Sequence, residues 1–426
     1  MQGYIDLAYK PKKEDLVTEY YIEPNGISLE EACNHIAAES SIGTWTDIST
    51  MSRSIAKRLA PHVFSIDKKT KEVKIAYPAE LFEAGNMPEI FSSIAGNIFG
   101  MKAVKCLRLQ DIDFPESIID SFKGPRFGIG GIRKLLRVPD RPLVGTIVKP
   151  KVGLSARQHA KVCYEAWVGG LDIVKDDENL TSMKFNRFDD RIRLTLKMRD
   201  RAEKETGEKK IYMPNITAET NEMLRRALKV KREGGEYIMV DILTIGWSGL
   251  QTVRDFNEEL NMVMHAHRAM HATMTKNRRH GISMMAIAKA SRLIGVDQLH
   301  VGTVNVGKMV GSAGDERPVE HEIESSFISE NPARHVLEQD WHKIKPVLAV
   351  ASGGLHPGSI PKLISIMGRN IVMQFGGGVH GHPQGTRAGA KAVKQALDAT
   401  MAGIALGEYA KNHAELGKAI SKWGIA

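Results

Sequence analysis

The feature that most constrains the fold is a series of eight short apolar segments, separated from one another by helical patterns. Each segment ends in polar residues or glycines. Continuous apolar strands that alternate with helices indicate a parallel sheet covered by helices. Eight such units fit a closed (β/α)8 barrel of the TIM type better than an open, doubly wound sheet. The segments are PLVGTIVKPK, LDIVKDDEN, KIYMPNIT, EYIMVDILT, NMVMHAHR, DQLHVGT, PVLAVASGG and NIVMQFGGG.

The residues before this series mix helical and strand patterns. GISLEEACNHIAAESS and MPEIFSSIAGNIFGM indicate helices, and HVFSID and EVKIAYP indicate strands. The pattern breaks into Gly, Pro and basic residues around FKGPRFGIGGIRKLLRVPDRP, which we interpret as the connection between two domains. The expected fold class is therefore α/β, with an N-terminal α+β (ferredoxin-like) domain over residues 1–125 and a C-terminal (β/α)8 barrel over residues 126–426.

Composition excludes several classes of protein. The 426 residues include no stretch near the ~20 apolar residues that span a bilayer, and the first residues lack the apolar core of a secretory signal. We therefore expect a cytoplasmic protein without a membrane partner. The formal charge of +9 is interspersed along the chain, so nucleic-acid binding is a weak alternative. Only three cysteines occur, without a CxxC pair, which supports neither a disulfide framework nor a thiolate zinc site.

Because the carboxyl ends of barrel strands carry the chemistry in this fold, the polar residues that end the apolar segments are the candidate site. They are Lys149, Lys151, Lys175, Asp177, Glu178, Asn215, His265, His267, Arg268, His300, Ser352 and the glycines 376–378.

The second segment ends in an unusual density of ionisable groups, Lys175-Asp176-Asp177-Glu178. Carboxylates that converge at a strand end suit a hard cation such as Mg²⁺, which takes oxygen ligands. Asp177 and Glu178 are the candidate ligands. The alternative is a salt-bridged loop in which Lys175 neutralises the two acids.

The first segment ends in Lys149-Pro150-Lys151. Two lysines held close together repel, which lowers the pKa of at least one amine and provides a base. Surface lysines are the commoner explanation of a lone KPK, but the same barrel mouth also offers a carboxylate pair.

Histidines end the fifth and sixth segments, in His265-Ala266-His267-Arg268 and at His300. Histidine exchanges protons near neutral pH, and arginine offers a planar fork to phosphate oxygens. Any one of these histidines could be a core residue, whereas their gathering on consecutive strands indicates a site.

Glycine-rich loops follow the last three strands. Ser352-Gly353-Gly354 and Gly376-Gly377-Gly378 end the seventh and eighth segments, where barrel enzymes frequently bind phosphate through backbone N–H groups. The loop after His300 carries Lys308 among glycines, which suits a mobile lid, although an ordinary surface loop explains it equally well. Together these loops indicate a phosphorylated substrate.

These segments closely resemble the ribulose-bisphosphate carboxylase large subunit, particularly its archaeal form III group. The resemblance runs from about residue 37 to residue 385 and follows the order of the family. The matching stretches are AAESSIGTWT, GNIFGMKA, GTIVKPKVGLS, GGLDIVKDDENLTS, HAHRAMHA, HGIS, QLHVGT, VGKM, SGGLHPG and QFGGGVHGHPQG.

The resemblance implies a Mg²⁺-dependent carboxylase. Lys175 would react with an activator CO₂ to form a carbamate, which becomes a third oxygen ligand for Mg²⁺ beside Asp177 and Glu178. Proton removal at C3 of ribulose-1,5-bisphosphate would give an enediolate that attacks CO₂, yielding two molecules of 3-phosphoglycerate. Oxygenation by O₂ would compete.

Further roles follow from the same resemblance. Lys149 would shuttle protons and Lys151 would tune its pKa and contact substrate, while His267 would assist hydration and Lys308 would stabilise the new carboxylate. Residues that match substrate-binding and phosphate positions are Arg268, His300, Ser352, Gly353, Gly354, Gln374, Phe375, Gly376 and Gly377.

In the family, the small domain of a neighbouring subunit completes the site. The matching residues are the catalytic Glu39 and Asn97 and the substrate-binding Thr44 and Trp45. The resemblance therefore implies a homodimer or an assembly of dimers, with no small subunit.

The chain departs from plant-type enzymes at several points. Ile147 stands where they have threonine, Val310 replaces a glutamate, and the lid GTVNVGKMVG is one residue longer. The chain also stops at Ala426 without their longer tail, so we expect poor discrimination against O₂. The competing hypothesis is a carboxylase-like enolase or isomerase of a related phosphorylated sugar, although such homologues usually lose several of the residues named here.

Overall fold

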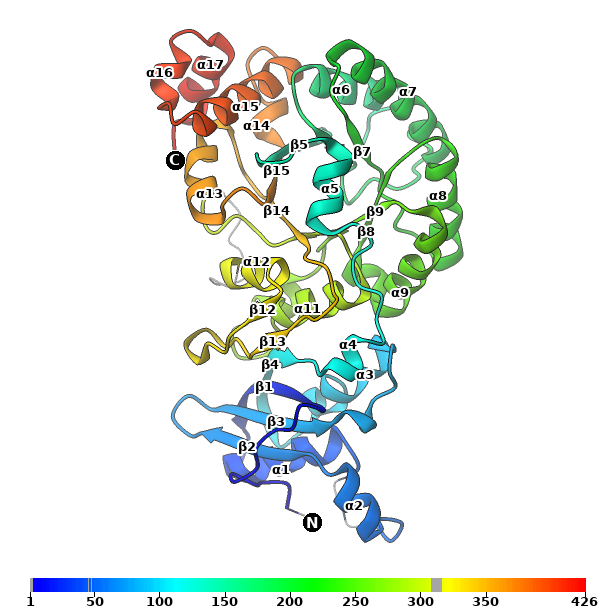
Figure 1. Cartoon of the computed structure of the whole chain (residues 1–426), viewed down its shortest axis with the longest axis vertical. Coiled ribbons are helices and arrows are strands. Elements are labelled where there is room, and N and C mark those ends of the chain that lie inside the picture. Colours follow the sequence, from blue (N-terminus) through cyan, green and yellow to red (C-terminus); the bar gives the residue numbers. More distant parts are fainter. Residues whose placement is uncertain (1–2, 45, 47, 308–315) are drawn as a thin grey trace. The chain divides into compact units, whose positions relative to one another are not determined.

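The computed structural model describes residues 3–44, 46, 48–307 and 316–426 (Figure 1). It divides into two compact units. The first comprises residues 1–124, 270–294 and 325–345, and the second comprises residues 125–269, 295–324 and 346–426. Two segments that interrupt the barrel sequence are thus grouped with the N-terminal residues.

The first unit is built on a five-stranded sheet with the order β10-β4-β1-β3-β2. Neighbouring strands are antiparallel, except that β10 lies parallel to β4. The order β4-β1-β3-β2, with helical segments between β1 and β2 and between β3 and β4, confirms the ferredoxin-like prediction. The strands are β1 (Asp15–Pro24), β2 (His62–Asp67), β3 (Glu72–Pro78), β4 (Val104–Asp113) and β10 (Gly281–Ile282).

The first predicted helix is α1 (Leu29–Glu39). Ser28 caps it by accepting a hydrogen bond from the backbone N–H of Glu31, whose side chain accepts one from the Ser28 backbone in return. The remaining elements of the first unit are α2 (Arg53–Leu59), η1 (Ala79–Leu81), α3 (Met87–Ile94), η2 (Asn97–Gly100), α4 (Glu116–Ile119), α10 (Ala272–Thr275), α11 (Met284–Ile294), β12 (Phe327–Ile328), η3 (Pro332–Arg334) and β13 (Gln339–Asp340).

The second unit contains an eight-stranded sheet whose paired strands are all parallel, with the order β7-β6-β5-β15-β14-β11-β9-β8. A parallel bridge between Asn215 and Met239 brings the end of β7 beside β8 and closes the barrel. The strands are β5 (Leu143–Ile147), β6 (Ile173–Lys175), β7 (Ile211–Met213), β8 (Tyr237–Asp241), β9 (Val263–His267), β11 (Gln298–His300), β14 (Leu348–Ser352) and β15 (Ile371–Phe375).

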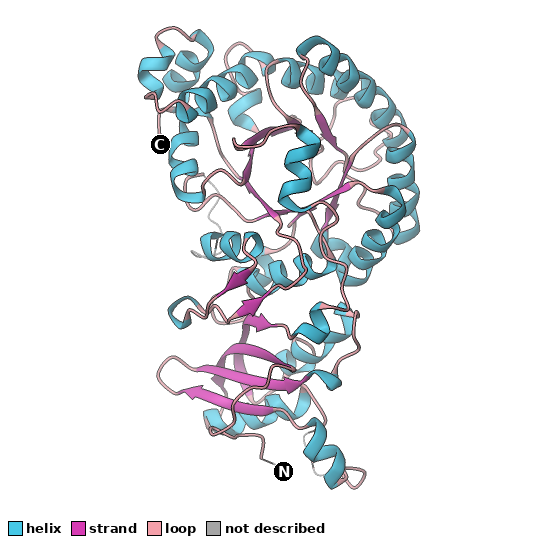
Figure 2. Cartoon of the chain, viewed as in Figure 1, coloured by secondary structure: helices cyan, strands magenta, loops and turns pink. Residues whose placement is uncertain are grey.

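Helices surround these strands (Figure 2). The first after β5 begins at a capping box, in which the Ser155 side chain accepts from the Gln158 N–H and Gln158 accepts from the Ser155 backbone. The helices of the second unit are α5 (Gly128–Leu136), α6 (Ala156–Val168), α7 (Phe188–Thr206), α8 (Thr220–Arg232), α9 (Ile242–Leu260), α12 (Glu316–Glu324), η4 (Pro357–Ser359), α13 (Ile360–Met367), α14 (Gly377–His380), α15 (Thr386–Met401), α16 (Leu406–Ala410) and α17 (Ala414–Trp423).

An apolar cluster fills the amino end of the barrel. Ile129, Ile132 and Leu136, on one face of α5, pack with residues that begin the strands, including Leu143 and Ile173. Each fully buried aliphatic side chain contributes about 1.5–3 kcal/mol. Because this end is closed with apolar side chains, the polar residues that follow the strands gather at the other end.

All eight predicted barrel strands are confirmed. The segment interpreted as a plain connection contains helix α5, whose apolar face was obscured by glycines and basic residues. The long strands β1 and β4 of the first unit were not predicted, nor were the two-residue strands β10, β12 and β13. Apolar and polar residues alternate over much of β4, whereas β1 shows no such alternation. Among the described residues, no helix combines the length and the apolar character that crossing a membrane requires.

Candidate active site

The carboxylates after β6 lie beside several cationic side chains. Glu178 Oε2 is 3.7 Å from Lys175 Nζ and 3.6 Å from His267 Nε2, and Glu178 Oε1 is 4.0 Å from Lys151 Nζ. Asp177 accepts a hydrogen bond of 2.6 Å from Lys149 Nζ. Three strand ends, those of β5, β6 and β9, therefore converge on one charged cluster.

Lys175 is fully buried at the end of β6. Burial lowers the pKa of its amine, opposed by the charges of Glu178 and Asp177. Burial alone would raise the pKa of Glu178, but the charges of Lys175 and His267 lower it to about 2. The cluster thus pairs a lysine that loses its proton more readily than usual with a carboxylate that keeps its negative charge.

Hydrogen bonds of Asp176 hold the end of β6 in place. Its carboxylate accepts hydrogen bonds from Tyr212 Oη at 2.7 Å, Arg191 Nε at 3.1 Å and the Asn215 backbone N–H at 3.0 Å. The His159 ring lies 3.1 Å away. Burial alone would raise the pKa of Asp176, and the charge of Arg191, with His159 and Tyr212, lowers it to about 2. The neighbours of Asp176 in sequence are thereby held in one orientation.

The histidines form a chain of contacts at the ends of β8, β9 and β11. Asp241 Oδ1 lies 2.9 Å from His267 Nδ1 and leaves Nε2 directed to Glu178. His265 Nδ1 donates to Gln298 Oε1, so His265 Nε2 accepts from His300 Nε2 at 2.9 Å. Burial lowers the pKa of His265 to about 3 and that of His300 well below its usual range. These two rings are therefore neutral near pH 7.

The glycine loops lie against the same strand ends. A Cβ on Gly376 would lie 3.3 Å from Lys149 Cε, and one on Gly307 would lie 2.0 Å from the carbonyl oxygen of Gly353. Gly353 has a φ of 127°, which side chains other than glycine rarely adopt. The loops after β11, β14 and β15 thus pack at the carboxyl end of the barrel, as a phosphate site in this fold requires.

The structure distributes the remaining predicted residues as follows. Gln374 is fully buried, and its amide faces Gly145 of β5. Arg268 and His300 are buried, Ser352 is partly exposed and Gly377 is exposed. Glu39 and Asn97 meet within the first unit, where Asn97 Nδ2 donates to Glu39 Oε1 at 3.4 Å. Thr44 is partly buried in the first unit, and Trp45 and Lys308 lie outside the described residues.

Some residues of this site were not predicted. Asp241 was not predicted as a site residue because it lies inside an apolar segment and Ile242 follows it directly. Its position at the carboxyl end of β8 could have identified it. The bond from Thr146 Oγ1 to the Phe375 carbonyl and its contact with His380 Nε2 at 2.9 Å join β5 to β15. No pattern in the sequence indicates that pair.

Known protein families match nearly the whole chain. Two family profiles match the chain: "Ribulose bisphosphate carboxylase large chain, N-terminal domain" over residues 3–118 and "Ribulose bisphosphate carboxylase large chain, catalytic domain" over residues 128–423. The chain belongs to the ribulose bisphosphate carboxylase large-chain family. The resemblance inferred from the sequence is thereby confirmed.

Similar members of this family are archaeal. A ribulose bisphosphate carboxylase of Methanosarcina mazei is 53% identical over 424 residues, covering 99% of each chain. That of Methanocaldococcus jannaschii is 52% identical over 427 residues, again covering 99% of each chain.

Solved structures of ribulose bisphosphate carboxylases share the fold. The dimeric archaeal enzyme of Hyperthermus butylicus superimposes with a TM-score of 0.94 at 45% identity, covering 99% of each chain. The octameric carboxylase/oxygenase of Pyrococcus horikoshii has a TM-score of 0.91 at 49% identity, covering 99% of this chain and 96% of that one. Agreement over whole chains confirms both parts of the predicted fold.

Proposed function

We propose that the chain is a ribulose-1,5-bisphosphate carboxylase that adds CO₂ to its sugar substrate and yields two molecules of 3-phosphoglycerate, with O₂ as a competing substrate. The observation that carries this proposal is the convergence of Lys175, Asp177 and Glu178 at the carboxyl end of the barrel. Full-length relatives that bear the carboxylase name support it. We also propose residues 1–125 and 126–426 as the two domains.

The donor set fits Mg²⁺ and a lysine carbamate. Carbamate formation needs a neutral amine, and burial favours this form of Lys175. The product replaces an ammonium by oxygens next to the carboxylates of Asp177 and Glu178, which gives the all-oxygen ligand set that Mg²⁺ prefers. When bound, the ion would polarise oxygen atoms of the sugar substrate and increase the acidity of the neighbouring C–H.

Other residues would move protons and bind the substrate. We propose Lys149 and His267 for proton transfer, and the contact of each with a proposed metal ligand through an amine or ring nitrogen supports this role. Lys151 lies 4.0 Å from Glu178 and is more than half exposed, which suits a contact with incoming substrate. The proposed lid residue is Lys308, and the proposed phosphate and substrate contacts are Arg268, His300, Ser352, Gly353, Gly354, Gln374, Phe375, Gly376 and Gly377.

We further propose that a second copy of the chain completes each site. Glu39, Thr44, Trp45 and Asn97 are the residues contributed across the dimer. The dimeric and octameric relatives support an assembly based on dimers.

One assay tests the function directly. The purified chain, with ribulose-1,5-bisphosphate and Mg²⁺, should incorporate labelled bicarbonate into 3-phosphoglycerate. An enolase or isomerase would consume or interconvert a phosphorylated sugar without incorporating the label. Absence of labelled product from protein preincubated with CO₂ and Mg²⁺ would refute the carboxylase proposal.

A mixing experiment tests the shared sites. Glu39→Gln and Lys175→Ala subunits should each be inactive alone, whereas hybrid dimers contain one site with both residues intact. Partial recovery of activity on mixing is the expected result. If mass spectrometry shows subunit exchange and no activity returns, the residues are not shared between subunits.

A further inference from the structure

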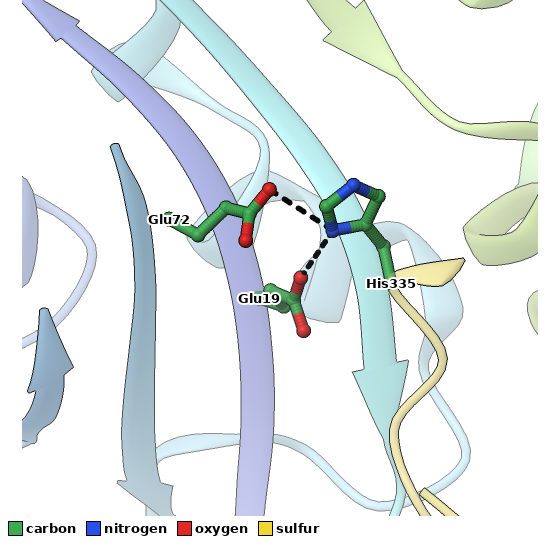
Figure 3. A group of neighbouring side chains, drawn as sticks. All are labelled: Glu19, Glu72 and His335. Carbon is green, nitrogen blue, oxygen red and sulfur yellow. Dashed lines mark hydrogen bonds and ion pairs between the residues drawn. The ribbon is translucent and has the colours of Figure 1, made fainter. Parts of the chain in front are cut away.

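Two glutamates and a histidine converge on one face of the first unit's sheet. The pairing of β1 with β3 places Glu19 opposite Lys74 and Tyr21 opposite Glu72, so both glutamates lie on the same face. His335, which follows η3, directs its Nδ1 between them (Figure 3). This nitrogen is 2.8 Å from Glu19 Oε1 and 3.2 Å from Glu72 Oε1. Residues from three distant parts of the chain thus present three ligand atoms to one point.

The cluster carries more negative than positive charge. Glu19 is only 2% exposed, and its Oε2 is buried without a hydrogen-bond partner among the described residues. The ammonium of Lys74 is 4.0 Å from this oxygen and also pairs with Glu330. With His335 neutral, the ion pairs of the described residues set three carboxylates against one ammonium, and of these carboxylates that of Glu19 is almost completely buried while that of Glu330 is 46% exposed. Buried charge without a partner is costly, so the site favours a dication or a protonated histidine.

Some neighbouring acidic side chains of this unit are neutralised and others add negative charge. Asp111 is fully buried and paired with Lys289 at 2.9 Å. Burial raises the pKa of Asp113 to about 7, and the charges of Asp111, Glu330 and Glu338 contribute to the increase against the effect of Lys289. The Asp111–Lys289 pair is therefore neutral, and Glu330 and Glu338 are the groups that add negative charge to this part of the unit.

We propose that Glu19, Glu72 and His335 bind one divalent transition-metal ion of the Zn²⁺ class. The ligand atoms lie within 4.8 Å of one another. Bonds of about 2.0–2.2 Å to zinc place neighbouring ligand atoms of a tetrahedron roughly 3.3–3.6 Å apart. The separations of 2.8 Å and 3.2 Å around His335 Nδ1 are slightly shorter, so the side chains would move apart by a few tenths of an ångström to admit the ion. Imidazole favours zinc over Mg²⁺, which prefers oxygen ligands alone. The ion supplies the missing charge, and Glu19 Oε2 or water can take the fourth position.

The site is independent of the proposed carboxylase chemistry, so its test does not depend on activity. The full-length chain is stripped with EDTA, incubated with a small excess of ZnCl₂ and an excess of MgCl₂, and desalted, and bound zinc is measured by mass spectrometry. We expect wild type to retain one more zinc per chain than either His335→Gln or Glu72→Gln. Glutamine preserves side-chain size in Glu72→Gln and a donor toward Glu19 in His335→Gln, so circular dichroism should show both variants folded.

Two controls and a spectrum complete the experiment. His342→Gln removes another histidine of the same segment, and Glu178→Gln removes a proposed Mg²⁺ ligand, yet both should retain this zinc. Wild type loaded with Co²⁺ should show visible absorption of low-symmetry, nitrogen-containing coordination, which His335→Gln lacks. Equal zinc and cobalt binding by wild type and both cluster variants overturns the proposal, as does no uptake by wild type. In the latter case His335 acts only as a protonated partner of the two glutamates.

Discussion

The two ends of the same eight strands carry opposite chemistry. At the amino end, Leu143 and Ile173 pack with Ile132 of α5 in a closed apolar cluster. At the carboxyl end, Lys175 follows Ile173 by two residues and enters a cluster of charges. A single strand thus supplies core packing at its beginning and chemistry at its end. Stability and activity are therefore separable by position along each strand. Mutations at the amino end should lower the free energy of unfolding, and mutations at the carboxyl end should lower activity.

The largest effect is expected at the carboxyl end. Lys175→Ala, Asp177→Ala and Glu178→Ala should each reduce carboxylation to no more than a few per cent, because each removes a proposed Mg²⁺ ligand. Circular dichroism and product assay on the same samples measure fold and activity together. Substantial activity in folded Lys175→Ala would exclude the carbamate.

The amino end should respond in the opposite way. Ile132→Ala removes a fully buried side chain from the apolar cluster and should lower the free energy of unfolding by about 2–5 kcal/mol. Activity per folded molecule at moderate temperature should change little. Thermal melting and initial rates decide the matter, and a large loss of rate in folded protein would contradict the separation of the two ends.

These two ends also differ in how well the sequence predicts them. Lys175, Asp177 and Glu178 were predictable because charged residues directly after an apolar strand stand out. Helix α5 was not, because glycines and basic residues interrupt the pattern that Ile129, Ile132 and Leu136 create.

Residues brought together by tertiary structure were the hardest to predict. Glu39 and Asn97 entered only through the family resemblance, since their own segments carry no chemical signal. Glu19, Glu72 and His335 come from widely separated segments, so only the folded first unit shows their proximity. Their proposed role therefore rests on geometry. The charges at the barrel mouth could be inferred from local sequence, whereas the carbamate role of Lys175 came from the family resemblance.

Acid should destabilise the carboxyl end through His380. Burial and the charge of Lys149 lower the pKa of its ring from 6.5 to about 4. Between these values the unfolded chain binds more protons, so stability falls as the pH decreases from 6.5 toward 4, by about 3 kcal/mol for this group. His380→Gln should flatten the dependence of the thermal midpoint on pH over this range. An unchanged slope would show that His380 becomes protonated without cost in the folded state.

The smallest effect tests the boundary between the two behaviours. The Asp176 carboxylate contacts Arg191, Tyr212 and the Asn215 backbone. Among the described residues, no hydrogen bond or ion pair joins it to Lys149 or Lys175, although its charge acts on the Lys175 amine. Asp176→Asn keeps the shape but removes the charge that Arg191 neutralises, so the strand end should loosen. We expect a loss of activity of about 10–100-fold, which excess Mg²⁺ partly restores because ligand orientation rather than ligand number has changed. The matched control is Asp190→Asn on α7, where the exposed carboxylate forms its ion pair, among the described residues, with the surface side chain of Arg193. Activity of this variant should be unaffected. Rates measured across a Mg²⁺ titration test this role. A shift of the Mg²⁺ dependence is expected if Asp176 positions Asp177 and Glu178. A lower maximal rate with an unchanged Mg²⁺ dependence would mean instead that Asp176 acts on the chemistry itself.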